Sequence, residues 1–207
     1  MIPPECLIDA YGQGFFPMAD PSTGALEWYR PDPRSIIELD GLHISRSLAR
    51  TLRRGEFSLT TDTCFERVLK ACAEPGPERE ETWLDHRIAK ACQALHHAGM
   101  AHSIEAWRDD NLVGGLYGIR IGGAFFGESM FSRPADGGTD ASKVCLVWLV
   151  SHLQQIGGTL LDVQFMTPHL QRLGAIEISD LAYQARLQTA IGASVRWDVP
   201  LQDPSRT

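Results

Sequence analysis

The stretch Leu160-Leu161-Asp162-Val163-Gln164-Phe165 is a short apolar run that carries a carboxylate and an amide two residues apart. Such a run predicts a buried strand, on which the side chains of residues i and i+2 project from the same face. Asp162 and Gln164 are therefore expected to stand side by side. Burying an unpaired polar group costs roughly 1–3 kcal/mol, so each needs a hydrogen-bond partner. The pair is either structural, satisfying a core amide, or catalytic, at the end of a strand.

The segments on both sides predict how this strand is embedded. Upstream, an antiparallel meander of three strands is expected over residues 101–107, 112–119 and 124–131. An apolar helix over 141–156 leads into the run, and a short helix over 169–175 leads out to a further strand that begins at Ile176. This order predicts an α+β fold with a mixed sheet flanked by helices, consistent with an acetyltransferase-like (GNAT-like) sheet.

The first half of the chain contains a helical pattern of unusual charge over residues 43–54. Ser45 is expected to cap its start and Gly55 its end. The buried face of this helix is expected to hold Ile44, Leu48 and Leu52. The other face carries arginines and no acidic residue: Arg46, Arg50, Arg53 and Arg54. A solvated face is the usual explanation, but such a face normally mixes signs, so phosphate binding is an equal alternative.

The remaining segments of the first half predict shorter elements. A short amphipathic helix from Leu7 ends at glycines, and further helices are expected over 61–73 and 84–98. Residues 74–81 form a polar, turn-rich loop, which is the best candidate for a mobile segment. Two prolines make residues 28–34 a rigid loop, whose aromatic pair either packs or stacks on a base.

Composition and charge argue against several classes of protein. The 207 residues suffice for one domain, or for one domain with a small appendage. Every apolar run is shorter than the roughly 20 residues that span a bilayer, and the N-terminus lacks signal-peptide features, so a cytoplasmic location is expected. The net charge of −7 argues against generic nucleic-acid binding, although a local basic patch can hold a phosphate backbone. Five scattered cysteines without a C-x-x-C pair, and histidines without H-x-x-x-H spacing, make a disulfide framework or a metal site improbable.

Seven stretches, in order and at compatible spacing, carry a resemblance to a known family. They are Phe15-Phe16-Pro17-Met18, Trp28-Tyr29-Arg30-Pro31-Asp32-Pro33-Arg34, Leu42-His43-Ile44-Ser45-Arg46-Ser47, Gly127-Glu128-Ser129-Met130-Phe131-Ser132-Arg133, Asp140-Ala141-Ser142-Lys143, Leu161-Asp162-Val163-Gln164 and Leu173-Gly174-Ala175. Together they resemble the motifs of the leucyl/phenylalanyl-tRNA–protein transferases. Several motifs in one order are far more specific than any one of them.

The resemblance implies a reaction and its substrates. An enzyme of this family moves Leu or Phe from Leu-tRNA or Phe-tRNA to the α-amino group of a protein with N-terminal Arg or Lys, which marks that protein for degradation. The resemblance implies an acetyltransferase-like catalytic domain, no metal or small cofactor, no membrane association, and a monomer. Because the ester is already activated, the enzyme must mainly hold ester and amine together.

The catalytic roles that the resemblance implies fall on three polar residues. Gln164 hydrogen-bonds the α-amine through its carbonyl oxygen, while Asp162 orients and polarises that amide. A glutamine is a poor base alone, so the pair is expected to act as one unit. Glu128, with Asp162, is expected to supply acidic surroundings that select a cationic acceptor side chain.

The resemblance also implies the groups that bind the donor. The terminal adenosine is expected to stack on Trp28 and Trp107. The acceptor-stem phosphates are expected to contact Arg46, Arg50, Arg53 and Arg54. The Leu or Phe side chain is expected in an apolar pocket of Leu116, Phe125, Met130, Leu146, Leu149 and Leu161, for which ordinary core packing is the alternative. A purely apolar pocket discriminates by shape, so relaxed specificity that includes Met is expected.

Some features depart from the family pattern. We expect a short N-terminal segment at residues 1–40, which carries the Phe-Pro and Trp-Tyr motifs, a catalytic domain at residues 41–200 and a tail at residues 201–207. Little or no separate N-terminal domain is therefore expected. The second aromatic of the usual Trp-Trp pair is Tyr29, and the loop at 134–139 is longer than usual. Leu149 stands at a pocket position that is often aromatic, which could favour Phe or alter the Leu preference.

Two other functions remain alternatives at this point. An acyl-CoA-dependent N-acyltransferase would use the same fold, but residues 165–169 contain no glycine that would let the backbone approach a pyrophosphate. A non-enzymatic tRNA- or peptide-binding module would keep the arginine stripe and the acidic pocket yet show no turnover. A cofactor-binding test with CoA and an aminoacyl-tRNA transfer assay separate the three.

Overall fold

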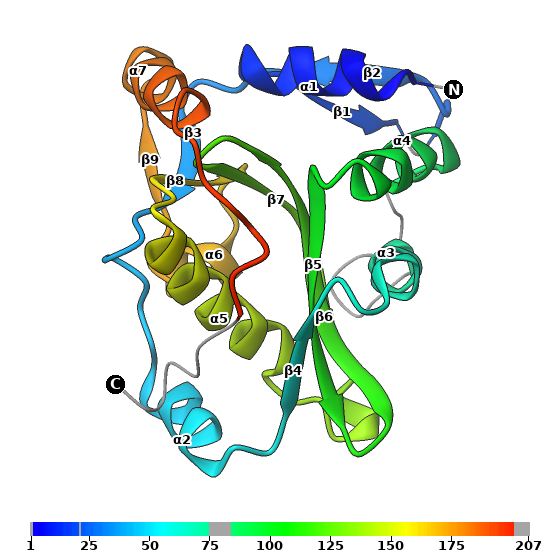
Figure 1. Cartoon of the computed structure of the whole chain (residues 1–207), viewed down its shortest axis with the longest axis vertical. Helices are drawn as coiled ribbons and strands as arrows, with labels where there is room; N and C mark the ends of the chain where they lie inside the picture. The colour runs from blue at the N-terminus through cyan, green and yellow to red at the C-terminus, as the bar shows by residue number, and fades with distance from the viewer. Residues whose placement is uncertain (1, 21, 75–83, 201–207) are drawn as a thin grey trace.

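The computed structural model describes residues 2–20, 22–74 and 84–200. The predicted mobile loop lies outside the described residues from position 75 onward, and so does the tail at 201–207. The main sheet has seven strands, which in spatial order are β4 (Ser58–Thr61), β5 (Ala101–Arg108), β6 (Asn111–Ile121), β7 (Ala124–Ser132), β8 (Leu160–Gln164), β3 (Arg34–Ile37) and β9 (Ile176–Ile178). The predicted α+β class with a mixed sheet is confirmed (Figure 1).

The centre of the sheet contains its parallel pair. Strands β5, β6 and β7 form the predicted antiparallel meander, whereas β7 and β8 run parallel. Their pairing covers Ala124–Phe126 against Leu160–Asp162 and then stops. Beyond this point the two strands no longer pair with each other, and the residues that follow include Glu128 on β7 and Gln164 on β8.

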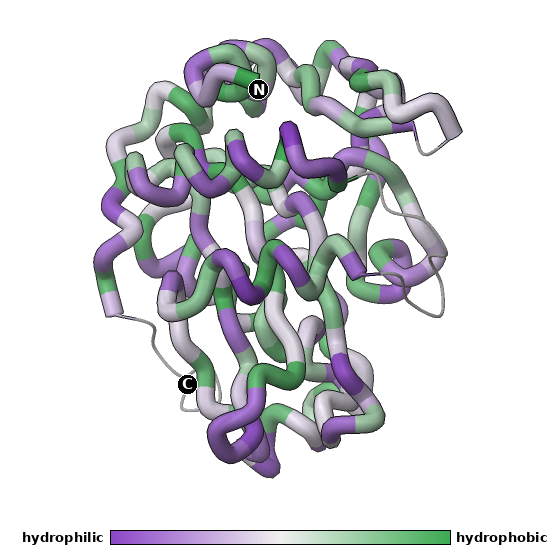
Figure 2. Tube along the Cα trace, turned by 90° about the vertical axis from the view of Figure 1, so that its right-hand side faces the viewer, coloured by the Kyte–Doolittle hydropathy of each residue, from purple (hydrophilic) through white to green (hydrophobic). Residues whose placement is uncertain are grey.

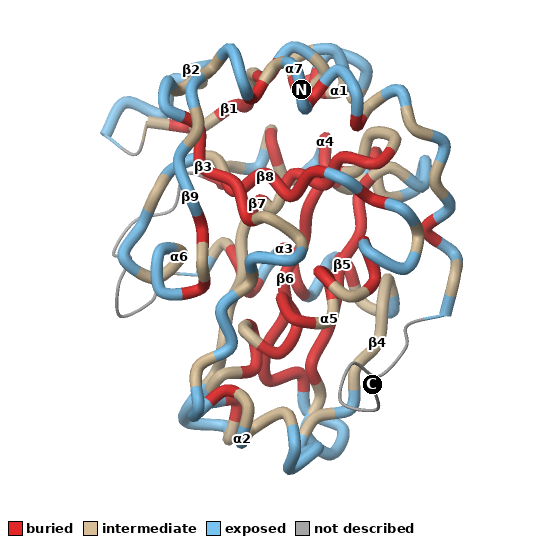
Figure 3. The backbone as a smooth tube through the Cα atoms, turned by 90° about the vertical axis from the view of Figure 1, so that its left-hand side faces the viewer, coloured by how far each residue is buried: buried red, intermediate tan, exposed pale blue. Residues whose placement is uncertain are grey.

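Helices cover both faces of the sheet. They are α1 (Pro4–Gly12), α2 (Arg46–Arg54), α3 (Phe65–Ala73), α4 (His86–His97), α5 (Ala141–Ile156), α6 (Pro168–Arg172) and α7 (Asp180–Ile191), with a 3₁₀ turn, η1, at Pro134–Asp136. In Figure 1, α3 and α4 lie on one side of the meander and α5 crosses the other. Figure 3 shows that burial concentrates in the central strands and α5, while α2 and many loops remain exposed.

The N-terminal residues form a small unit that shares the main core. Strands β1 (Phe16–Ala19) and β2 (Leu26–Tyr29) make a two-stranded sheet of their own. Leu7, Tyr11 and Phe16 nevertheless belong to the hydrophobic cluster that also contains buried residues of α3, α4 and α7. The segment therefore shares the main hydrophobic core, and burying these side chains against the sheet stabilises both parts.

The helix of residues 43–54 confirms its predicted caps. The Oγ of Ser45 accepts a hydrogen bond from Leu48 N, and Gly55 ends α2 in the left-handed region, with φ 60°. Leu48 is buried, but Ile44 is 41% exposed and precedes the helix, so its predicted place in the buried face is wrong. Without helical geometry at position 44, the spacing of four residues does not determine which way that side chain points.

Several elements are missed or misplaced by the sequence pattern, including the two short strands of the N-terminal hairpin, β1 and β2. Strands β3 and β4 have four residues each, too short to show a period of two, and helix α3 begins at Phe65 rather than near position 61. Helix α7 was also not predicted, although Ser179 caps it. Along the trace, hydrophobic and hydrophilic residues alternate over short distances (Figure 2). No described helix is long and apolar enough to cross a membrane.

Candidate active site

Gln164 ends β8 in an unusual backbone conformation. Its φ is +61°, in the left-handed region that costs a non-glycine residue roughly 1 kcal/mol. This turn breaks the alternation of side chains expected for a strand. The amide Nε2 of Gln164 consequently reaches across to β7 and donates a hydrogen bond to Oε1 of Glu128, at 3.0 Å. Gln164 and Glu128 are thereby in contact at the point where the parallel strands part.

Asp162 acts on Gln164 through the backbone rather than through the side chain. Its Oδ1 accepts a hydrogen bond from the backbone N–H of Gln164 at 2.9 Å. The carboxylate is completely buried and also accepts from the Tyr183 hydroxyl, at 2.6 Å. The predicted pairing of the Asp162 and Gln164 side chains is wrong, because the left-handed turn at 164 directs the amide away from Asp162.

A buried arginine neutralises Asp162. Arg34 donates from Nε to Oδ1 at 2.9 Å and from Nη2 to Oδ2 at 2.6 Å, and both side chains have no exposed surface. The guanidinium lies between the rings of Phe16 and Tyr183, 4.7 and 4.6 Å from their centroids. A third donor, Nη1, reaches the carbonyl of Gly14 at 2.8 Å. Such a two-point pair is strong in a dry environment, and losing one partner would leave the other as an isolated buried charge.

Glu128 carries less negative charge than the sequence pattern predicts. Burial is the main cause that raises its pKa, to about 8, and the negative charge of Asp162 adds to this effect. The Tyr11 hydroxyl and Gln164 oppose the rise by donating to Oε1, at 2.8 and 3.0 Å. Since Asp162 is fully buried and paired with Arg34, it does not face the acceptor as a free charge, and the acidic surroundings expected from two carboxylates are reduced to Glu128, whose pKa is raised. An incoming cation would favour ionisation of Glu128.

An apolar cavity of about 190 Å³ opens beside the Gln164–Glu128 contact. Five of the six predicted pocket residues line it: Leu116, Met130, Leu146, Leu149 and Leu161. Phe125 does not, and its place in the pocket is corrected: the ring is fully buried and stacks at 5.5 Å on Trp197. The sequence pattern missed Val163, Thr167 and Leu170, which also line the cavity. These three follow Asp162 in the chain, at positions where the strand gives way to α6.

A second cavity of about 190 Å³ meets the first at the same two polar residues. Both are lined by Glu128 and Gln164. The second has an aromatic and thioether wall of Phe16, Met18 and Phe165. The Phe165 ring is 42% exposed and packs edge-on against Phe16, with 5.4 Å between centroids. The N-terminal hairpin therefore completes this side of the site.

The two predicted stacking tryptophans are not brought together. Trp28 is on β2, in the hairpin at the top of Figure 1, and is 41% exposed. Trp107 pairs with Ser58 at the start of β4, toward the other end of the sheet, and its Nε1 donates to Thr60 Oγ1 at 2.8 Å. Neither lines the two cavities. The two rings are therefore not placed to hold one adenosine between them, because β2 lies beside the N-terminal helix, whereas Trp107 lies where β5 pairs with β4, farther down the sheet (Figure 1).

All four predicted phosphate-binding arginines are exposed on α2. Arg54 approaches Glu56 at 3.5 Å, a contact between exposed groups that is worth little. Helix α2 lies at the end of the molecule opposite the N-terminal hairpin (Figure 1). The stripe thus stands apart from the two cavities, as a surface for an extended substrate would.

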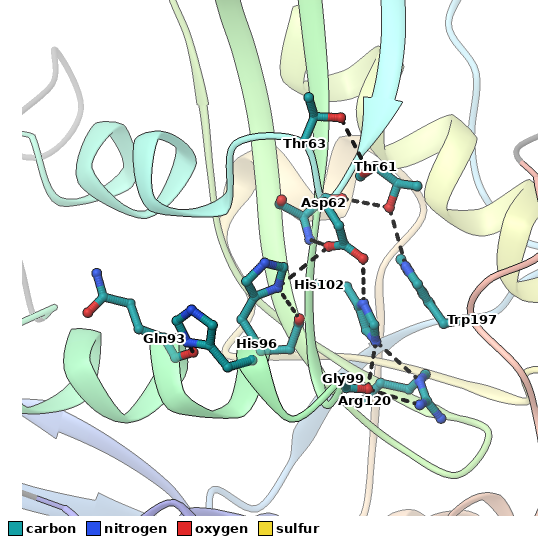
Figure 4. Close-up of polar contacts among 12 residues, drawn as sticks. Thr61, Asp62, Thr63, Gln93, His96, Gly99, His102, Arg120 and Trp197 are labelled. Carbon is teal, nitrogen blue, oxygen red and sulfur yellow. Dashed lines mark hydrogen bonds and ion pairs between the residues drawn. The ribbon is translucent and has the colours of Figure 1, made fainter.

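A separate polar cluster holds the C-terminal segment (Figure 4). Nδ1 of His102 lies 2.8 Å from Oδ2 of Asp62, which accepts its hydrogen bond, and the ring stacks on Trp197 with 4.1 Å between centroids. The indole Nε1 of Trp197 donates to Thr61 Oγ1 at 3.3 Å. Burial lowers the pKa of His102, although Asp62 opposes this effect. These contacts hold the residues near position 197 against the sheet.

Within the described part of the chain, no three His, Cys, Asp or Glu side chains are grouped so that they could hold a metal ion.

Three residues of the site escaped the sequence pattern. Arg34 ends a quoted motif but received no role, and Tyr11 and Tyr183 lie on helices whose patterns gave no reason to single them out. In the sequence, Arg34 stands in a proline-rich loop, a context that predicts a solvated side chain. Its burial follows only from pairing with Asp162, 128 positions later in the chain.

Comparisons with known proteins agree over most of the chain. Residues 36–188 match the family model described as leucyl/phenylalanyl-tRNA protein transferase, and residues 1–32 match the model of the N-terminal domain of that family. The second match corrects the expectation that this domain is largely missing. Its residues contribute Tyr11, Phe16 and Met18 to the site.

Individual relatives carry the same description. A leucyl/phenylalanyl-tRNA–protein transferase of Novosphingobium aromaticivorans is 52% identical over 190 residues, 91% of this chain and 71% of the relative. One of Rubrobacter xylanophilus is 51% identical, covering 91% of this chain and 94% of the relative, and one of Chlorobaculum parvum is 46% identical, covering 94% and 98%. The solved structure of L-PGS from Bacillus licheniformis aligns with a TM-score of 0.43 at 15% identity, over 81% of this chain and 55% of that one.

Proposed function

The chain belongs to the leucyl/phenylalanyl-tRNA–protein transferase family, and on this premise we propose how its residues carry out the transfer. The enzyme is an aminoacyltransferase that uses aminoacyl-tRNA. The acceptor is proposed to be the α-amino group of a protein beginning with Arg or Lys, which is then marked for degradation. The family assignment replaces the acyl-CoA and non-enzymatic alternatives. A cytoplasmic location and a monomer remain proposals.

The observation that carries the proposed mechanism is the hydrogen bond from Gln164 to Glu128. Because Nε2 donates to Glu128 at 3.0 Å, the carbonyl oxygen of the same amide is left to accept from the attacking amine. In the reaction, the amine nitrogen forms a bond to the ester carbonyl carbon and the bond from that carbon to the 3′ oxygen breaks. The proton lost by the amine ends on the departing 3′ oxygen. Gln164 orients the amine while this transfer occurs.

Asp162 is proposed as a positioning residue. It holds the backbone N–H of Gln164 and is itself fixed by Arg34 and Tyr183. This network stabilises the left-handed turn that aims the amide at Glu128. Asp162 does not need to touch the substrate to matter for the rate.

The first cavity is proposed to take the Leu or Phe side chain. Its lining is apolar apart from a few groups near its rim, and its volume of about 190 Å³ suits a side chain of that size. The ester carbonyl must then lie at Gln164, and the ribose bonded to it must lie next to the first cavity. The second cavity meets this requirement, so the adenine is proposed to stack against Phe16, Met18 and Phe165 instead of Trp28 and Trp107.

The arginine stripe on α2 is proposed to bind the acceptor stem. Its four exposed guanidinium groups present donors to a phosphate backbone on a chain that is otherwise acidic. The acetyltransferase-like character of the fold is likewise a proposal, supported by the mixed sheet whose central parallel strands part beside the site.

One assay tests the function directly. Labelled Leu-tRNA, Phe-tRNA and Met-tRNA are offered to a peptide that begins with Arg or Lys, and transfer of label to the peptide is measured. Leu and Phe are expected to transfer efficiently and Met more weakly, and ribonuclease treatment should abolish transfer. Peptides beginning with acetyl-Arg serve as the control, since they have no α-amine. Absence of transfer from every donor would refute the proposal.

A further inference from the structure

A third cavity, of about 230 Å³, lies between the start of α2, the first turn of α5 and helix α6. Six polar residues from these elements line it: His43, Ser45, Ser47, Lys143, His169 and Arg172. Leu48 and Leu173 complete the lining. No Asp or Glu is among the described residues that line this cavity, although the chain carries a net charge of −7.

The chemistry of this lining suits an anion. Lys143 donates from Nζ to Asp140 Oδ1 at 2.6 Å, which fixes the ammonium but uses one of its three donors. Arg172 is anchored through Nε to the carbonyl of Pro168 at 3.0 Å, and its guanidinium carries four further N–H donors. Ser45, Ser47 and Leu48, at the start of α2, line the same cavity. The side chains of two cations, Lys143 on α5 and Arg172 on α6, therefore line one cavity together with the start of α2.

The position of the cavity indicates which anion it would meet. His169 lines both this cavity and the proposed aminoacyl cavity, so the two are neighbours on either side of α6. On its other side the third cavity is bordered by α2, which carries the exposed arginines. A single-stranded RNA segment that runs from the ester to an acceptor stem bound at α2 must pass the third cavity.

We propose that the third cavity binds a phosphodiester of the single-stranded 3′ end of the aminoacyl-tRNA. The inference rests on the proposed function and adds a contact between the ester and the acceptor stem. Single-stranded RNA carries one negative charge per nucleotide, and cationic side chains offset the repulsion it would meet from an acidic protein. The segments Leu42–Ser47 and Asp140–Lys143, which the sequence pattern left without a complete role, both supply residues of this cavity.

The test compares three Phe donors that differ in their phosphates. Phenylalanyl-adenosine has no phosphodiester, phenylalanyl-CpCpA has the single-stranded phosphates, and Phe-tRNA adds the acceptor stem. KM is measured for each with a peptide that begins with Arg. In the unmodified enzyme, KM should be at least about tenfold lower for the trinucleotide than for the nucleoside. In K143Q/R172Q the ratio of the nucleoside KM to the trinucleotide KM should shrink about fivefold or more. A plot of log KM for the trinucleotide against log salt concentration should also become less steep, by about 0.7 in slope for each lost phosphate contact.

Two further variants make the outcome specific. R50Q/R53Q on α2 should keep the trinucleotide ratio and lose part of the further gain from Phe-tRNA. K70Q/K90Q removes the same charge from α3 and α4 and should keep both ratios, and thermal unfolding checks that every variant is folded. An unchanged trinucleotide ratio in K143Q/R172Q overturns the inference while leaving the proposed function intact. Failure of the unmodified enzyme to use any of the three donors removes both.

Discussion

Gln164 donates from its side-chain amide to Oε1 of Glu128 at 3.0 Å, and this contact determines which end of the amide faces the cavities. The same Oε1 accepts from the Tyr11 hydroxyl at 2.8 Å, so Glu128 is held from two sides. Because the amide nitrogen is engaged, the amide oxygen is the atom that we propose accepts from the incoming amine. The orientation of this one amide depends on the N-terminal helix through Tyr11, on strand β7 through Glu128 and on strand β8, which ends at Gln164.

Replacing Gln164 by alanine should lower kcat by about 10²-fold, because the amine loses the acceptor that orients it for attack. KM for aminoacyl-tRNA should change less than threefold, since the cavities and the arginine stripe remain. Steady-state transfer of labelled Phe to an Arg peptide measures both constants. Gln171→Ala, at an exposed position on α6, is the matched control. A kcat near that of the unmodified enzyme would exclude Gln164 from the mechanism.

Replacing Asp162 by alanine should lower the free energy of unfolding by about 3–5 kcal/mol, because the Arg34 guanidinium stays buried without its partner. Tyr183→Phe removes one hydrogen bond to the same carboxylate and should cost only about 1–2 kcal/mol. Urea unfolding measures both values. The double variant R34L/D162L should be more stable than D162A, since it removes both charges together. Equal unfolding midpoints for D162A and the unmodified enzyme would contradict the assigned pair.

The contribution of Glu128 to stability should fall as pH rises from about 5 to 9. Burial raises the pKa of its carboxyl from 4.5 to about 8, so the folded protein retains a proton that the unfolded chain releases in this range. The stabilisation is complete below about pH 4.5 and is lost as pH rises through about 8. In Glu128→Gln, which cannot ionise, this part of the pH dependence should vanish. Urea midpoints at pH 5, 7 and 9 measure it, with Glu66→Gln at an exposed position on α3 as control.

The parts of the fold that could be predicted from sequence are those with a local signal. The meander, helix α5 and the caps of α2 follow from periodicity, apolar length and cap residues, and the predicted helix over 141–156 agrees with the structure at both ends. Strand β3 is different. Its four residues become a strand only because β8 and β9 pair with it on both sides. No local pattern reports a partner that lies more than a hundred residues away.

The same distinction separates the predicted and missed parts of the site. Glu128 and Gln164 were recognised together through motifs, and five of six pocket residues line the first cavity. The direction of the Gln164 side chain was predicted wrongly because strand geometry was assumed up to its last residue, where φ is +61°. Arg34 was missed because its burial depends on a partner across the sheet. The sequence pattern therefore does not predict the backbone geometry at the end of a strand, nor the pairing of two charged residues that are far apart in the chain.

Acid should loosen the C-terminal segment through His102. Burial lowers the pKa of His102 below its ordinary value of about 6.5, and the same cause lowers the pKa of His152, whose Nε2 lies 3.1 Å from the Trp197 carbonyl. The unfolded chain therefore binds protons more readily than the folded protein. The stabilisation is present above about pH 6.5 and is lost as pH falls toward the lowered folded pKa values.

Between pH 7.5 and 5.5 the two histidines should lower the urea midpoint while Glu128 raises it, so the histidine contribution is measured as a difference between variants. The variant H102Q/H152Q cannot take up these protons, so its change in midpoint from pH 7.5 to 5.5 should be more favourable than that of the unmodified enzyme, whatever its stability at pH 7.5. His97→Gln, at an exposed position on α4, controls for histidine replacement alone. Identical slopes for H102Q/H152Q and the unmodified enzyme would show that these two histidines do not set the acid sensitivity.

Leu149 should tune the choice between Leu and Phe. Its side chain is 1% exposed and lines the first cavity, whose volume is about 190 Å³. Leu149→Phe fills part of this space, so kcat/KM for Phe-tRNA should fall more than kcat/KM for Leu-tRNA. The ratio of the two constants should shift about tenfold, because a pocket that discriminates by shape does so by roughly 1–3 kcal/mol per methylene. Leu149→Ala enlarges the cavity and should shift the ratio the opposite way. Competition between labelled Leu-tRNA and Phe-tRNA measures the ratio, and Leu181→Phe, at a position 84% exposed on α7, should leave it unchanged. If both Leu149 variants keep the original ratio, the amino-acid side chain binds elsewhere, because a wall residue of its pocket cannot change size without favouring one of two substrates that differ in size.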